Sequence, residues 1–139
     1  MSLFKKIEAA MIGDNYPLDD VLNELKWNEE GLIPAIVQNA HSKEVHMMAW
    51  MDRAALLETL TTHQVCFWSR SRQKRWRKGE ISGHTQTLIE ARIDCDADTL
   101  LLLVQQVGPA CHTNRMSCFY GTLTDEKLTV MSEPEKSLK

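Results

Sequence analysis

Three acidic residues at alternate positions stand out among the groups that could do chemistry. Asp94, Asp96 and Asp98 occur within five residues, and carboxylates this close repel one another unless a cation lies between them. A site built of oxygen ligands favours a hard ion such as Mg²⁺. The spacing does not fit an EF-hand, because the sixth position from Asp94 is Thr99 rather than glycine. The cluster predicts either a magnesium site or a solvated acidic turn, and spacing alone leaves both open.

The four cysteines, Cys66, Cys95, Cys111 and Cys118, form a second group of possible ligands. The basic N-terminal residues are not followed by the apolar stretch of a signal peptide, so we expect the thiols to be reduced. In such chains cysteines are more often metal ligands or catalytic groups than parts of disulfides. Three thiolates and a water would make an open zinc site of the catalytic kind. Burial in the core is the alternative. We favour burial for Cys66, which lies in an apolar stretch, whereas polar residues after Cys111 argue against it there.

Basic residues are concentrated in one segment. Six of the nine residues from 70 to 78 are basic and none is acidic, although the whole chain has a net charge of −3. A positive patch in an acidic protein indicates a local anionic ligand, whereas nucleic-acid binders usually have a broader basic face. Arginine and serine side chains could bind a phosphate, and a tryptophan ring could stack on a purine; the alternative is a solvated loop. The expected contacts are Trp68, Ser69, Arg70, Arg72, Trp76 and Lys78.

Two histidines could act as a general base near neutral pH. They are His112, which directly follows a candidate ligand, and His84. We prefer His112 for that reason. His41, His46 and His63 are expected to be surface or packing residues.

The elements that must position these groups are mostly strands. Helical spacing of apolar residues predicts helices over 3–11 and 18–26, and Asp52 can cap a third over 53–62. Alternating or apolar patterns predict strands over 33–38, 44–50, 64–70, 85–96 and 99–106.

Alternation along residues 85–96 relates one thiol to the carboxylates. Odd positions would face the core, and Cys95 would then point away from Asp94 and Asp96. This thiol and the carboxylates therefore need not share one metal.

Composition excludes several classes of protein. The chain has 139 residues, 43% of them hydrophobic and 25% charged, which is typical of one globular domain. Its longest apolar run, 100–104, is far shorter than the ~20 residues of a membrane span. We expect a cytoplasmic protein that binds neither a membrane nor nucleic acid. The segment after residue 123 is polar and is expected to fray.

Several segments between residues 20 and 120 together match the motifs of one known family. They are 31–38, Trp68–Arg72, Trp76 with Lys78–Glu80, Ser82–His84, Asp94–Asp98, Ala110–Thr113 and Ser117–Phe119. On these segments the chain resembles the phosphoribosyl-AMP cyclohydrolase family. It departs from the family's usual residues at Asn39, Asp52, Ile81 and Asn114, where Asp, Asn, Thr and Gly are usual. None of these is an expected metal ligand.

The resemblance implies a fold, a reaction and two metals. Members of the family hydrolyse the N1–C6 bond of the adenine ring of 1-(5-phosphoribosyl)-AMP, a step of histidine biosynthesis. They are homodimers of a small, mainly β fold with short helices, in the α+β class, with metal sites at or near the subunit interface. The implied ligands are Cys95, Cys111 and Cys118 for a zinc ion shared between subunits, and Asp94, Asp96 and Asp98 for magnesium.

This resemblance leads to a mechanistic hypothesis and a division of the chain. An acidified water would attack C6 of the purine, with His112 or His84 as base. Residues 1–16 would be an extension outside the resemblance, 17–123 the cyclohydrolase domain and 124–139 a polar tail. Because so few residues follow Phe119, we expect one activity only.

Two other functions compete with this hypothesis. A zinc nucleoside deaminase is excluded, because no histidine of the chain is followed two residues later by glutamate. The remaining alternative is a zinc-stabilised RNA-binding module that uses the basic segment 70–78.

Overall fold

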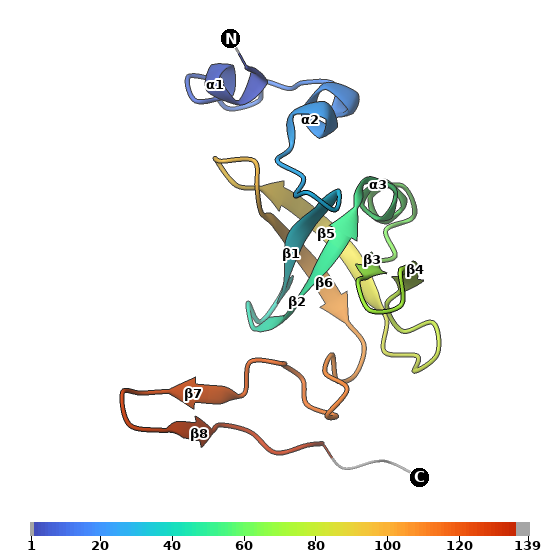
Figure 1. Cartoon of the computed structure of the whole chain (residues 1–139), viewed down its shortest axis with the longest axis vertical. Coiled ribbons are helices and arrows are strands. Elements are labelled where there is room, and N and C mark those ends of the chain that lie inside the picture. Colours follow the sequence, from blue (N-terminus) through green and yellow to red (C-terminus); the bar gives the residue numbers. More distant parts are fainter. Residues whose placement is uncertain (1, 136–139) are drawn as a thin grey trace.

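The computed structural model describes residues 2–135 and has a small, mainly β fold with short helices (Figure 1). In these residues no helix is long and apolar enough to cross a membrane. The helices are α1 (Leu3–Ile7), α2 (Leu18–Glu24) and α3 (Arg53–Thr62). The strands are β1 (Leu32–Asn39), β2 (Val45–Asp52), β3 (Cys66–Ser69), β4 (Lys74–Arg77), β5 (Gln86–Ile93), β6 (Leu100–Gln106), β7 (Gly121–Leu123) and β8 (Leu128–Val130).

Six of the strands form one curled sheet, in the order β4-β3-β2-β1-β6-β5. The β1–β6 pair is parallel and the other pairs are antiparallel. The sheet curls until the residues before β3 bond to β5. There the Val65 N–H donates to the Gln86 carbonyl at 3.1 Å, and the Leu88 N–H donates to the His63 carbonyl at 2.7 Å. This closure brings the loops at one end of the sheet together.

The centre of the sheet is its most apolar part. Strands β1 and β6 have one fully buried face and a second face that is partly covered, which is consistent with their nearly continuous apolar sequences. Ile33, Ala35 and Val37 of β1 are fully buried, as are Leu102 and Val104 of β6. The strand predicted over 99–106 is therefore confirmed as β6.

Helix α3 follows the prediction over 53–62, because the sequence supplies both of its ends. The Asp52 carboxylate accepts a hydrogen bond from the Ala55 N–H at 2.7 Å, which satisfies a free donor of the first turn. The helix ends at His63, whose φ of 65° is left-handed. Helices α1 and α2 are also present where predicted, but they end earlier, at Ile7 and Glu24.

The alternation predicted along residues 85–96 is wrong in its first half. A β-bulge between Leu88 and Glu90 shifts the register of β5 against β6. An extra residue in a strand reverses which side chains face the core. Before the bulge, Gln86 and Leu88 are the buried side chains, and Ile89 is 61% exposed. After it, odd positions such as Ala91 pack against the core, as predicted.

The same strand ends sooner than predicted. Strand β5 stops at Ile93, so Cys95 lies in an exposed turn rather than on a strand face. The argument that Cys95 points away from Asp94 and Asp96 by strand alternation therefore fails. The backbone of that turn is left-handed at Ala97, whose φ is 62°.

Three strands, β4, β7 and β8, lie where no pattern predicted them. The basic segment folds back on β3 as β4, which its charged side chains concealed. The C-terminal segment that was expected to fray contains β8, which pairs with β7 in a separate two-stranded sheet. Figure 1 shows this β7–β8 hairpin standing apart from the six-stranded sheet.

Candidate active site

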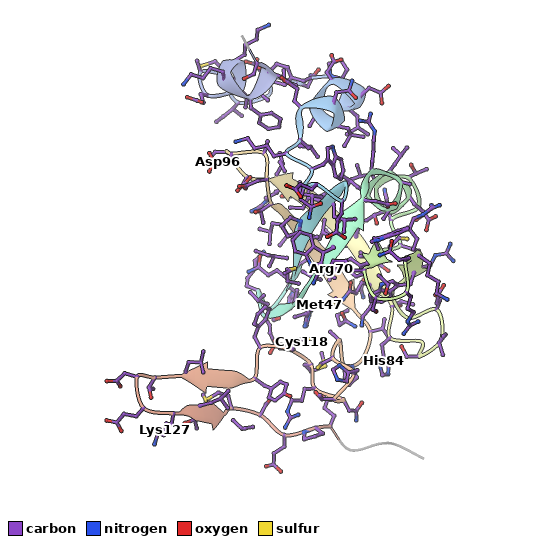
Figure 2. All side chains as sticks on the ribbon, viewed as in Figure 1. Met47, Arg70, His84, Asp96, Cys118 and Lys127 are labelled. Atoms are coloured by element: carbon purple, nitrogen blue, oxygen red, sulfur yellow. The ribbon has the colours of Figure 1, made fainter. Side chains whose placement is uncertain are left out.

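A cavity of about 500 Å³ opens between the β3–β4 hairpin, the loop after β4 and the loop after β6. Figure 2 shows His84 and Cys118 at this end of the molecule. The cavity brings both candidate bases together with a candidate ligand and part of the basic segment. The predicted site residues that line it are Ser69, Arg72, Trp76, Lys78, His84, Cys111 and His112.

Two of the expected zinc ligands, Cys111 and Cys118, lie close enough for each to shift the pKa of the other. Burial alone would raise the pKa of Cys111, but hydrogen bonds from Thr113, whose hydroxyl lies 3.0 Å from the sulfur, and from Cys118 lower it. Partial burial and the neighbouring Cys111 raise the pKa of Cys118 to about 11. The surroundings therefore favour the thiolate of Cys111 more than that of Cys118, whose proton a bound cation would displace. This pair could hold a metal ion.

Strand β2 anchors the loop that carries Cys118. The Cys118 N–H donates to the His46 carbonyl at 2.7 Å, and the Ser117 hydroxyl donates to the Val45 carbonyl at 2.6 Å. The sequence predicts a surface or packing role for His46, and no neighbouring residue signals this contact.

Asn114 occupies a position where glycine is usual in the family that the chain resembles, and the backbone explains both residues. Its φ is 65°, in the left-handed region that glycine and asparagine adopt most readily. The Asn114 N–H donates to the Cys111 carbonyl at 2.9 Å and so closes the turn after that cysteine.

Lys78 is tied to the cysteine loop. Its ammonium nitrogen donates to the Ala110 carbonyl at 2.7 Å and lies 5.5 Å from the centroid of the Trp76 ring. Burial lowers the pKa of Lys78, and the nearby Cys118 and Cys111 oppose that shift. The side chain therefore places a positive charge beside the two sulfurs. Its expected contact with substrate phosphate stays a prediction.

The structure does not bring every predicted contact to the cavity. Trp68 pairs with Trp50 of β2 in the sheet register, and the Arg70 guanidinium stacks 4.9 Å from the centroid of the Trp50 ring. Neither Trp68 nor Arg70 lines the cavity, whereas Ser69 and Arg72 do. For Trp68 and Ser69 the difference follows from strand geometry, because successive side chains of β3 point to opposite faces of the sheet.

The two candidate bases line the cavity in different ways. His84 is half-buried, and its ring packs against Gly108 so closely that a Cβ there would lie 2.7 Å from His84 Cδ2. Gly108 also has a φ of 68°, so the position strongly favours glycine. His112 is exposed at the mouth. The structure thus fixes the ring of His84 and leaves that of His112 accessible.

The three aspartates converge in the turn between β5 and β6. One carboxylate oxygen from each of Asp94, Asp96 and Asp98 lies within 4.8 Å of the others, and all three residues are exposed. Burial opposes ionisation of Asp94, but hydrogen bonds from Asp98, Thr99 and Ala97 lower its pKa. The hydrogen bond with Asp94 raises the pKa of Asp98. This set of three convergent oxygens fits a hard divalent cation.

The thiol pair and the aspartates lie at opposite ends of β6. Cys95 and the aspartates precede this seven-residue strand, and Cys111 and Cys118 follow it. A strand of that length spans roughly 20 Å, and Figure 2 shows Asp96 and Cys118 at opposite ends of the sheet. One chain therefore does not bring Cys95 to the other two cysteines.

Comparison with known proteins gives a consistent family. The model of the family described as phosphoribosyl-AMP cyclohydrolase matches residues 47–120. Phosphoribosyl-AMP cyclohydrolase 2 of Pseudomonas fluorescens is 57% identical, over 94% of this chain and 88% of its own length. The phosphoribosyl-AMP cyclohydrolase of Hydrogenovibrio crunogenus is 54% identical over 94% of this chain and 89% of its own. The enzyme of that name in Alkalilimnicola ehrlichii is 56% identical over 96% of this chain and 94% of its own.

Proposed function

This chain belongs to the phosphoribosyl-AMP cyclohydrolase family, and from that premise we propose that its cavity is where the family's reaction takes place. The chain is a hydrolase of histidine biosynthesis that opens the adenine ring of phosphoribosyl-AMP at the N1–C6 bond. The observation that carries the placement is the lining of the cavity, where His84, His112 and Cys111 meet the basic β3–β4 hairpin.

A zinc ion would be held by Cys111 and Cys118 of one subunit and by Cys95 of the partner subunit. Two adjacent sulfurs with opposite pKa shifts support the first half of this assignment. The second half is supported by the position of Cys95 at the far end of β6. Because an open zinc site needs three protein ligands, a second copy of the chain is the natural source of the third.

The exposed β7–β8 hairpin also favours a homodimer. It begins three residues after Cys118, and every residue of both strands is exposed. A two-stranded hairpin is marginally stable in water unless something covers it. Its apolar side chains Leu123, Leu128 and Val130 are each more than half exposed. Burial of these side chains against a second subunit would stabilise both the hairpin and the shared site.

Magnesium would bind the three aspartates of the β5–β6 turn. Their convergent oxygens, their exposure and the absence of a lysine or arginine partner for any of them among the ion pairs of residues 2–135 support this assignment. The β5–β6 turn contains both Cys95 and the aspartates. In the proposed dimer, the partner's β5–β6 turn would therefore come close to the cavity. The ion would then supply positive charge near the substrate.

The residues of the chain can perform the remaining chemistry. When bound, zinc would supply an acidified water for attack on C6 of the purine. His112 or His84 would accept the proton of that water at a ring nitrogen and return it to N1 as the N1–C6 bond breaks. The ring of Trp76 could stack on the purine, and Arg72 and Ser69 could bind a phosphate through N–H and O–H donors.

An RNA-binding role for the basic segment has little support. Its side chains divide between the cavity and a stack on Trp50 rather than forming one broad face. The relatives that match nearly the full chain carry the name of the enzyme. As a biosynthetic enzyme with free thiols, the protein would work in the cytoplasm.

Ring opening of phosphoribosyl-AMP, followed by ultraviolet absorbance, tests this function. The purified protein should turn over the substrate, lose activity after chelation and regain full activity only when both zinc and magnesium are restored. Full activity of a verified metal-free preparation would contradict the metal assignments. No turnover of phosphoribosyl-AMP with both metals present would contradict the reaction itself.

A further inference from the structure

His46 of β2 is a buried polar residue that the reaction described above does not use. Its side chain is 0% exposed, whereas the other four histidines are half-buried or exposed. Both ring nitrogens have partners: Nδ1 lies 2.8 Å from the Met116 carbonyl oxygen, and Nε2 lies 3.3 Å from Asn39 Nδ2. A buried imidazole with two such partners is held in one orientation.

The surrounding hydrogen bonds define which nitrogen of His46 carries the proton. The side-chain oxygen of Asn39 accepts the N–H groups of His41 and Ser42, each at 2.9 Å. That pairing directs the Asn39 NH₂ group at His46, so Nε2 is an acceptor. Nδ1 then carries the hydrogen and donates it to the Met116 carbonyl. An aspartate at position 39 could not donate this hydrogen bond.

We propose that His46 is a positioning residue for Cys118. The loop Met116–Cys118 is attached to β2 at both ends. The ring of His46 binds the Met116 carbonyl, and the backbone carbonyl of His46 accepts the Cys118 N–H at 2.7 Å. One residue thus fixes the backbone on both sides of Ser117. This fixes where the Cys118 sulfur lies relative to Cys111. The proposal rests on the metal centre proposed above, because it concerns a ligand of that centre.

The position of a ligand matters because zinc affinity depends on how well the free site is organised. Residues that orient metal ligands through hydrogen bonds typically change metal affinity by about 10- to 100-fold when they are replaced. Without the His46 ring, the Met116 carbonyl loses its partner and the loop is held by the Cys118 and Ser117 hydrogen bonds alone. We therefore expect loss of the His46 ring to weaken zinc binding more than the loss of another equally buried side chain would.

The experiment compares three variants of the full-length protein. His46→Leu keeps an apolar side chain in the core but removes both ring hydrogen bonds. His46→Asn places an N–H donor close to the position of Nδ1 and is the conservative rescue. Thr59→Val is the matched control, because Thr59 is also 0% exposed and loses hydrogen bonds to Ala55 and Cys66, but it lies on α3 away from the cysteine loop.

Two measurements separate positioning from general stability. Zinc affinity, from competition with a chromophoric chelator, should fall about tenfold or more in His46→Leu, return to within a few-fold of wild type in His46→Asn and stay unchanged in Thr59→Val. Amide hydrogen exchange at Cys118 in the metal-free protein should be about tenfold faster in His46→Leu only. Equal losses in His46→Leu and Thr59→Val, or unchanged exchange at Cys118, would overturn the proposal. If the wild type binds no zinc, the metal centre fails, and hydrogen exchange still decides the role of His46.

Discussion

The ammonium nitrogen of Lys78 lies 2.7 Å from the carbonyl oxygen of Ala110, the residue directly before Cys111. The contact joins the residue after β4 to the loop after β6, and both the basic hairpin and Cys111 line the cavity. It also holds a positive charge near the sulfurs, and that charge lowers the pKa of Cys118 against the larger effect of burial. Lys78 is therefore placed to favour the thiolate that a metal ion needs.

Replacement of Lys78 by methionine should slow alkylation of Cys118 in the metal-free protein. Loss of the charge raises the pKa of this thiol further above its value of about 11, so less thiolate is present at any pH below that value. We expect a severalfold lower rate constant at pH 8, measured with iodoacetamide and peptide mass spectrometry. Lys74→Met is the control, because Lys74 belongs to the same hairpin but is exposed. Equal rates in the wild type and Lys78→Met would mean that the ammonium group does not act on this sulfur.

Much of the fold follows from local sequence signals. Helix α3 follows from a local signal, because the Asp52 side chain caps its first turn. Strand β6 was predicted because a strand buried on both faces has a nearly continuous apolar sequence. The phase of β5 was missed, since the bulge after Leu88 depends on pairing with β6 and leaves no local signal. Strand β4 was missed because solvent-facing basic residues hide its pairing with β3.

The candidate site divides in the same way. The convergence of Asp94, Asp96 and Asp98 follows from their spacing in one short turn, and the structure contains it. Separation of Cys95 from Cys111 depends on the direction of β6, which the spacing of cysteines does not encode. The contact of His46 with Met116 joins residues 70 positions apart, so only the folded chain reveals it.

Arg72 should matter more for substrate binding than Arg70. Arg72 lines the cavity, whereas the guanidinium of Arg70 stacks on Trp50. Because contacts with a phosphate act alike on the substrate and the transition state, Arg72→Ala should raise KM about tenfold with little change in kcat. Arg70→Ala is the matched control and should leave KM within about twofold of wild type. Steady-state kinetics on both variants would refute the assignment if Arg70→Ala had the larger effect on KM.

His112→Ala should lower kcat more than it raises KM. The exposed position of His112 at the mouth of the cavity allows it to exchange protons with solvent between turnovers. A general base contributes about 10²–10⁴-fold to a rate, so a loss of kcat in that range is expected under saturating substrate. A loss of only a few-fold would transfer the role to His84, whose ring is fixed against Gly108. His63→Ala, at the end of α3 and outside the cavity, is the control.

Asp96→Asn should impair the magnesium site and leave zinc bound. The change removes one charged oxygen from the convergent set but no thiol. The magnesium concentration that gives half-maximal activity should rise about tenfold or more, while zinc content, measured by atomic emission, stays near that of the wild type. Asp20→Asn provides a control of the same charge change at an exposed site on α2. Loss of zinc in Asp96→Asn would mean that both groups of ligands bind one metal.

A mixture of two inactive variants tests the shared zinc site. Cys95 lies before β6, and Cys111 and Cys118 lie after it, so the proposed site takes its ligands from two subunits. Cys95→Ala and Cys111→Ala should each be inactive alone, because every site lacks one sulfur. In a dimer with one chain of each kind, one site has all three sulfurs and the other lacks two. After subunit exchange, activity should return to about a quarter of wild type if half of the dimers are mixed. A ligand set within one chain would leave every site damaged, so no recovery after exchange verified by native mass spectrometry would refute the shared site.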